Sequence, residues 1–115
     1  MQNPNNNVGL RGKVTDSPVP VIKNGVPVAI TFGLLVDRFC TWNGERKYDV
    51  FQVKYCFHDS QTDFALSLKQ GDQISLVGSL YTEWRHGTAK VCVRTDSIIR
   101  TERAEFQEPQ VALPY

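Results

Sequence analysis

Aromatic and basic side chains are mixed at two places in the chain, where together they could bind a flexible polyanion. Residues 38–55 read RFCTWNGERKYDVFQVKY, with five aromatic side chains and four cations around one Asn-Gly pair. A tryptophan, an arginine and a histidine follow one another at residues 84–86. Unpaired bases stack on exposed aromatic rings, and cations neutralise phosphates. The two groups therefore predict a surface for single-stranded nucleic acid.

Large aromatic rings can instead fill the core of a small domain, so each ring has two possible roles. We assign Phe32 and Phe64 to the core, because they lie within apolar patterns. Trp42 and Trp84 lie beside turn residues and cations, which favours exposure. The two tips therefore offer Phe39, Trp42, Tyr48 and Trp84 as stacking residues, and Arg38, Arg46, Lys47 and Arg85 as phosphate contacts.

Catalytic chemistry has little support in the residues. His58 and Asp59 closely follow Cys56, and such groups could in principle form a nucleophilic or acid–base site. Neighbouring side chains on an extended segment point to opposite faces, so a surface histidine before a helix cap is the simpler interpretation. Cys40, Cys56 and Cys92 lack CxxC spacing, and no glycine-rich phosphate loop occurs. We predict no enzymatic activity, no cofactor and no metal.

Length and composition indicate one globular domain. The chain has 115 residues, of which 41% are hydrophobic and 22% charged. It has no apolar run near 18 residues, and its start, MQNPNNN, does not resemble a secretory signal. With an odd number of cysteines, we expect a reduced, cytoplasmic protein without a membrane segment.

Charge is distributed unevenly along the chain. Residues 1–100 carry twelve Lys and Arg against nine Asp and Glu, whereas residues 101–115 carry one Arg and three Glu. A mildly basic body suits an anionic partner. The periodic pattern fades near residue 100, so we expect a domain over residues 1–100 and a short, flexible, polar tail over 101–115.

Alternation of apolar and polar residues predicts strands. Val8, Leu10 and Val14 share one parity, while Arg11 and Lys13 share the other and would form a basic outer face. Both cations are further candidates for phosphate contacts. Later strands are expected at residues 28–37, 49–57, 74–80 and 89–98, with tight turns at 24–25, 43–44 and 85–87.

Two segments between the predicted strands have features of their own. Pro18 and Pro20 cannot lie in a central strand and are expected to end the first strand. A short helix is expected from Asp59 or Ser60, either of which could be the cap, to about residue 68, with Gly71 near its end. Three strands, a helix and two strands is the order of the OB-fold, so we predict an all-β, five-stranded, partly open Greek-key barrel.

The third predicted strand allows two interpretations. Phe51 and Phe57 share a parity with Tyr55, and if this parity faces the core, Gln52 and Lys54 would contact nucleic acid. A shift of one residue exchanges the two faces, which would make Phe51 and Phe57 stacking residues. Periodicity favours the first interpretation.

Five segments resemble the bacterial and phage single-stranded DNA-binding proteins, the SSB family. These segments are NNVGLRGKVTDSP, NGVPVAITFGLLVDR, NGERKYDVFQV, LKQGDQISLVGSL and the tryptophan of YTEWRHG. They occur in the family's order over about residues 6–100. The resemblance implies an OB-fold assembled as a homotetramer, without catalysis, that acts in DNA replication, recombination and repair.

The resemblance also implies positions for the binding residues. Matched by motif, the family's aromatics fall on Phe39 or Trp42, Phe51, Phe57 and Trp84, whereas matching forward from GERKYD favours Gln52 and Cys56 instead. The chain departs from the family in its tail, which ends in ALPY and lacks a run of aspartates. Recruitment of replication or recombination proteins through the tail is therefore doubtful, and the short form resembles a phage or plasmid version.

The sequence thus predicts a protein that binds single-stranded DNA with little sequence preference. One rival is a primosomal or RNA-binding OB-fold module, which would contact the 2′-hydroxyl. Another is a protein-interaction module whose exposed aromatics form an interface, with subunits or with other proteins.

Overall fold

A computed structural model describes residues 4–39 and 43–104, and in this part of the chain six strands form one sheet. One short 3-10 turn and one short helix lie between the fourth and fifth strands. In chain order the elements are β1 (Val8–Val14), β2 (Val19–Lys23), β3 (Val26–Asp37), β4 (Tyr48–Cys56), η1 (Asp59–Gln61), α1 (Thr62–Ser67), β5 (Gln73–Arg85) and β6 (Thr88–Glu102).

The sheet closes because β1 pairs on both of its edges. Residues 8–13 of β1 pair antiparallel with β5, while Lys13 and Val14 also pair with β3. The ring then runs β1, β3, β4, β6, β5 and back to β1, with β4 and β6 parallel. This arrangement is the five-stranded OB-fold barrel, so the predicted fold class is confirmed.

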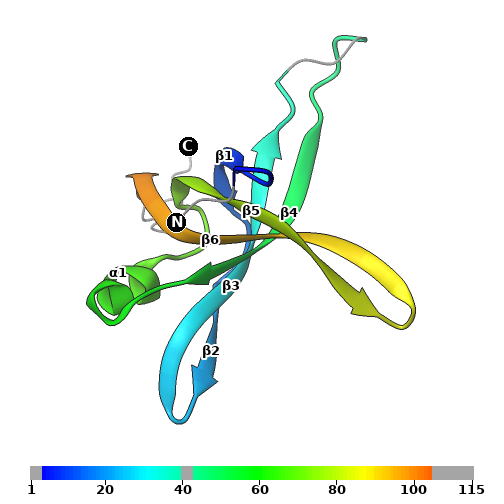
Figure 1. Ribbon diagram of the computed structural model, residues 1–115. Helices are drawn as coiled ribbons and strands as arrows, with labels where there is room; N and C mark the ends of the chain where they lie inside the picture. The colour runs from blue at the N-terminus through cyan, green and yellow to red at the C-terminus, as the bar shows by residue number, and fades with distance from the viewer. Residues whose placement is uncertain (1–3, 40–42, 105–115) are drawn as a thin grey trace.

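Strand β1 ends at Val14, before the prolines, as predicted, but the sequence did not predict the strand β2 that follows. Strand β2 pairs with β3 alone, with Pro20 opposite Ile30, and therefore lies at an edge outside the barrel. An edge strand bonds on one side only and tolerates a residue without an N–H. Figure 1 shows β2 and β3 as a hairpin that extends away from the barrel, and the β5–β6 hairpin extends in another direction.

Two tight turns lie where the sequence predicts them. Asn24 and Gly25 have φ angles of 52° and 77°, and His86 and Gly87 have φ angles of 51° and 78°. Two consecutive residues with positive φ are typical of the type I′ turn, whose twist matches that of antiparallel strands. The predicted turn at 43–44 is different, since residues 38–47 join β3 to β4 as a longer connection.

The helical segment is shorter and is capped differently from the prediction. Asp59 and Ser60, the predicted caps, lie inside η1, and His58 precedes them with its backbone N–H bonded to Gln61 Oε1 at 2.9 Å. The segment ends at Ser67, and Gly71 makes a left-handed turn before β5. Its buried residue Ala65 packs with the barrel core.

The barrel interior is filled by the apolar parity of each strand. On β3, Ile30, Phe32 and Leu34 are each at most 1% exposed, as their alternation predicts. Phe64 packs against this core and makes an edge contact with the ring of Tyr55. The other members of the core are Val14, Val53, Tyr55, Phe57, Leu68, Ile74, Leu76, Val93 and Ile98.

A buried carboxylate, Asp72, joins the start of β5 to the end of the described chain. Its side chain is fully buried and accepts bonds from the N–H groups of Lys69 at 3.0 Å and Ala104 at 2.8 Å, and from Arg100 at 3.2 Å. Burial raises the pKa of Asp72, but these donors outweigh burial and hold the pKa below its ordinary value. Strand β6 continues to Glu102, beyond the strand of residues 89–98 that the sequence predicted.

We predict that Asp72→Asn lowers the free energy of unfolding by about 2 kcal/mol at neutral pH, because charged hydrogen bonds are lost. An aspartate with a lowered pKa stabilises the fold above its unfolded-state pKa of about 3.9. This contribution is lost as the pH falls through the lower, folded-state pKa. Urea unfolding from pH 7 to pH 2.5 should therefore show the parent and the variant converging in acid.

Asp63→Asn on the exposed side of α1 is the matched control and should unfold like the parent at every pH. If the free energies of unfolding of the parent and of Asp72→Asn differ by the same amount down to the lowest pH, the proposed role of the Asp72 charge is contradicted.

Candidate nucleic-acid interface

The register of β4 decides which of its faces is exposed. Tyr55 is 1% exposed and Phe57 is 9% exposed, and their rings meet edge to face at 5.6 Å. Phe51 is partly buried against the same core. This parity of β4 therefore faces the barrel core, although Phe57 also lines a pocket at the end of the strand. The use of Phe51 and Phe57 as stacking residues stays a prediction. The alternative that periodicity favoured, with Gln52 and Lys54 outside, is the one the structure has.

The other parity of β4 belongs to a continuous outer face. Lys54 lies beside Arg94 of β6, and Arg94 lies beside Ser79 of β5. Side chains at paired positions lie on the same side of a sheet. Tyr81, two residues beyond Ser79, shares this side. We call the set Gln52, Lys54, Ser79, Tyr81 and Arg94 the outer face.

Tyr81 supplies the aromatic ring of the outer face. It is half-buried and is paired with Cys92 on β6. Burial, then the neighbouring Cys92 and Glu83, raise the pKa of Tyr81 to about 12, so its phenol is neutral at physiological pH. The ring therefore offers an uncharged surface beside two cations.

Lys54 and Arg94 have no ion-pair partner within residues 4–39 and 43–104. Arg94 is exposed and Lys54 is half-buried. Of the residues of the outer face, Lys54 is among the predicted phosphate contacts, whereas Arg94 and Tyr81 are not among the predicted site residues. The alternation along β6 could have identified Arg94, because Lys90, Cys92 and Arg94 alternate with the apolar residues of the same strand.

Four of the predicted phosphate contacts are already paired with carboxylates. Arg38 holds Asp49 through two bonds of 2.6 and 3.0 Å. The bonds from Arg38 lower the pKa of Asp49, and the N–H of Phe39, then Arg46, lower that of Asp37. A phosphate would have to compete with these carboxylates for each cation. The four pairs are Arg38–Asp49, Arg46–Asp37, Lys47–Glu45 and Arg85–Glu83.

Arg11 and Lys13 lie elsewhere on the barrel. Both point outward from β1, as predicted, but β3 separates β1 from β4 on one side. Lys13 instead lines a second pocket, which includes Gln73 and Glu102. The structure therefore does not bring these two cations together with Lys54.

The aromatic residues predicted for the hairpin tips are exposed where the structure describes them. Phe39 is 88% exposed, Trp84 71% and Tyr48 49%. The guanidinium of Arg46 lies 5.8 Å from the centre of the Tyr48 ring. Trp42 lies outside the described residues. Exposure makes these rings accessible to bases, and their use as stacking residues stays a prediction.

Trp84 lies on the opposite side of the β5–β6 hairpin from Tyr81. The register pairs Trp84 with Ala89 and Thr82 with Val91, whereas Tyr81 pairs with Cys92. Leu80, Trp84 and Val91 form an exposed apolar surface, with 42%, 71% and 60% of each residue accessible. We call these three residues the hairpin apolar face.

Among residues 4–39 and 43–104, no group of three His, Cys, Asp or Glu side chains is arranged to hold a metal ion. No helix in the same ranges is long and apolar enough to cross a membrane.

The fold is shared with proteins of known structure. A single-stranded DNA-binding protein of Plasmodium falciparum, solved with single-stranded DNA, is 20% identical and has a TM-score of 0.71 over 89% of this chain and 99% of that one. A small single-stranded DNA-binding protein of Streptomyces coelicolor is 22% identical, with a TM-score of 0.59 over 82% and 92%. A mitochondrial one from S. cerevisiae is 5% identical, with a TM-score of 0.64 over 87% and 97%.

No protein-family model and no curated protein matches the chain. At these identities the structural likeness establishes the OB-fold that the sequence predicted.

The two described cysteines offer a test of the strand register. Cys56 is partly accessible on the outer side of β4, and Cys92 is buried on β6. We predict that iodoacetamide alkylates Cys56 in the native protein and reaches Cys92 only after denaturation, as peptide mapping by mass spectrometry would show. An inert Cys56 would mean that β4 is shifted by one residue and that Tyr55 faces solvent.

Proposed function

We propose that this chain binds single-stranded DNA along the outer face, without catalysis and with little overall dependence on sequence. The observation that carries the proposal is that Tyr81 shares the outer face with Lys54 and Arg94, two cations with no ion-pair partner among residues 4–39 and 43–104. Bases stack on aromatic rings and phosphates pair with cations, and neither interaction identifies the base.

The exposed rings at the hairpin tips are further candidates for stacking, although Trp84 lies on the other side of its hairpin from Tyr81. Phe39 and Trp84 stand at the ends of two arms of the barrel, where a flexible strand can pass over them. The solved relatives, which share the fold, include one determined with single-stranded DNA, and this supports the choice of ligand. We further propose that the protein protects exposed strands during DNA replication or recombination, in the cytoplasm, and that it does so as an oligomer.

We predict that oligo-dT quenches the fluorescence of Trp42 and Trp84, and that its affinity falls as salt rises, because phosphate binding releases counterions. Lys54→Ala should lower the slope of log affinity against log salt by about 0.7, the value for one phosphate contact on a single strand. Arg94→Ala should do the same. Titrations at several salt concentrations measure both.

Lys69→Ala, which removes an exposed lysine beyond α1, is the control and should keep the parent slope. A folded protein that shows no binding to oligo-dT at low salt would overturn the proposed function.

A second prediction concerns the aromatic ring of the outer face. Tyr81→Leu should lose about 1–3 kcal/mol of oligo-dT affinity, the usual contribution of one stacked base, whereas Tyr81→Phe should bind like the parent. Trp84→Ala is compared in the same assay. If Trp84→Ala weakens binding and Tyr81→Leu does not, the strand runs along the hairpin apolar face, and our choice of face is wrong.

The hairpin apolar face supports a second candidate function, a protein interface. Leu80, Trp84 and Val91 are large, exposed and adjacent, as residues in subunit contacts often are. Burial of such a surface depends weakly on salt, whereas phosphate binding depends on it strongly. The salt titration therefore separates the two functions, and a self-associating protein with no oligo-dT binding would favour this one.

A further inference from the structure

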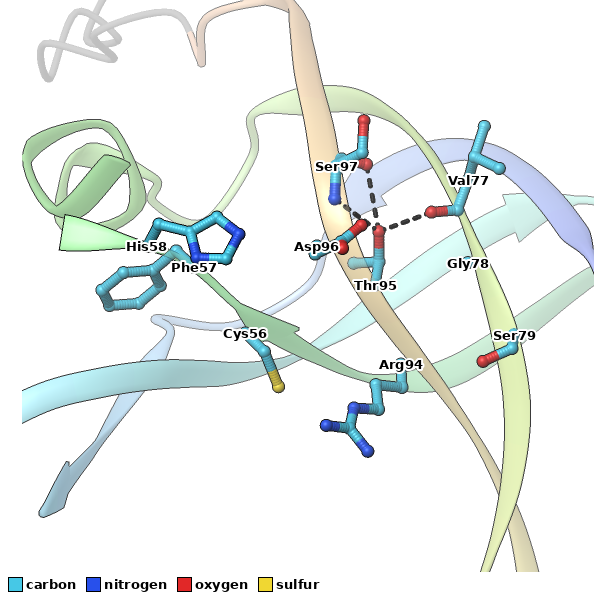
Figure 2. Close-up of a pocket in the computed structure, with 10 residues that line it drawn as sticks. All are labelled: Cys56, Phe57, His58, Val77, Gly78, Ser79, Arg94, Thr95, Asp96 and Ser97. Carbon is cyan, nitrogen blue, oxygen red and sulfur yellow. Dashed lines mark hydrogen bonds between the residues drawn. The ribbon is translucent and has the colours of Figure 1, made fainter. Parts of the chain in front are cut away.

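A pocket opens beside the outer face, where β4 and β6 separate. It has a volume of about 360 Å³, within the range of small-ligand sites. It is lined by residues from the end of β4, from β5 and from β6 (Figure 2). The lining residues that matter for its chemistry are Phe57, His58, Arg94 and Asp96.

The backbone itself makes this opening. The β4–β6 pairing ends at Tyr55 opposite Thr95, so beyond this point the two strands have no common hydrogen bonds. The β5–β6 register shifts between Val77 and Gly78. A side chain at Gly78 would come within 2.2 Å of the carbonyl oxygen of Arg94, so glycine is required for this close approach. The pocket is therefore fixed by the fold and does not need a ligand to form it.

The bend in β6 is held by Thr95. Its buried hydroxyl donates to the carbonyl oxygen of Val77 at 2.6 Å and accepts from the N–H of Ser97 at 3.0 Å. These bonds, drawn in Figure 2, hold the segment that carries Asp96 in place. The pocket residues on β6 are therefore presented on rigid backbone, as selective recognition requires.

The pocket combines an acceptor and a donor of hydrogen bonds with an aromatic wall. Arg94 and Asp96 both line the pocket, on either side of Thr95, where the β5–β6 register shifts. Asp96 has no ion-pair partner within residues 4–39 and 43–104. Figure 2 shows the His58 ring turned toward the segment of β6 that carries Asp96, with the Phe57 ring beneath it.

We propose that this pocket receives one base of the bound strand and prefers guanine. The inference rests on the proposed function, because Lys54 would bring the strand to the mouth of the pocket, where Arg94 would exchange its phosphate for the base when that base is guanine. Guanine has two adjacent donors, N1–H and N2–H₂, for the carboxylate of Asp96, and two adjacent acceptors, O6 and N7, for the guanidinium of Arg94. Thymine has no exocyclic amine and cannot satisfy the carboxylate in this way.

The test compares strands that differ only in one base of a thymine background. Oligo-dT is compared with d(TTTG), d(TTTC) and d(TTTA) repeats of the same length, in a lithium buffer that prevents guanine quartets. The parent protein should bind the guanine-containing strand about fivefold more tightly than oligo-dT, as expected for one partly exposed bidentate pair. Asp96→Asn should lose this preference and should shift it toward the adenine-containing strand, since amides pair with adenine.

Glu83→Gln is the matched control. Glu83 is a carboxylate on β5, on the same side of the sheet as Tyr81, and unlike Asp96 on β6 it does not line the pocket. Its neutralisation should change the affinity for all four strands by the same factor and keep the preference for guanine. The ratio of the affinities for the guanine-containing oligonucleotide and oligo-dT therefore separates recognition by Asp96 from a general effect of negative charge.

The outcomes distinguish this inference from the proposed function. A parent protein that binds all four strands equally, or an Asp96→Asn variant that keeps the guanine preference, overturns the inference and leaves single-stranded DNA binding intact. A parent protein that binds none of the strands overturns both.

Discussion

The structure depends on β1 pairing with two different strands. Its first residues extend the sheet through β5, and its last two also pair with β3, so one short strand converts an open sheet into a barrel. The two neighbours can approach because residue 12 is glycine. A Cβ there would come within 2.2 Å of the carbonyl oxygen of Leu35. Without this approach the β3 edge would remain open, and β4 would lose its fixed position.

Closure determines which side chains are available for binding. In a barrel this small, alternate side chains of each strand fill the interior, and the remaining side chains must face outward. Tyr55 and Val53 are therefore core residues for the same reason that Lys54 lies outside. Because β4 and β6 are paired in the ring, Lys54 and Arg94 are held side by side by the backbone rather than by contacts of their own.

Much of this could be predicted from the sequence, because alternation reports burial directly. The long pattern of β3 and the favoured parity of β4 were both correct. Strand β2 was missed because Pro18 and Pro20 exclude a central strand, whereas the fold needs only an edge strand there. Arg94 was missed because its partner Lys54 is forty residues away, and sequence patterns do not show which strands become neighbours. The pairing of Arg38 and Arg46 with carboxylates was missed for a different reason, because a strand pattern does not show which charged side chains near a turn contact each other.

These ion pairs bear on how the proposed binding would work. Because the cations of the β3–β4 connection are paired with Asp37, Asp49 and Glu45, few charges remain for phosphates, in keeping with a net charge of only +1. Single-strand binding through about two phosphate contacts would give a slope of about 1.4 in log affinity against log salt, which is measurable but smaller than that of a protein with many phosphate contacts. Most of the affinity must then come from stacking, which is where the exposed rings contribute. The ion pairs would serve to hold that connection in shape, with Arg46 beside Tyr48, so that its rings lose less freedom when a base arrives.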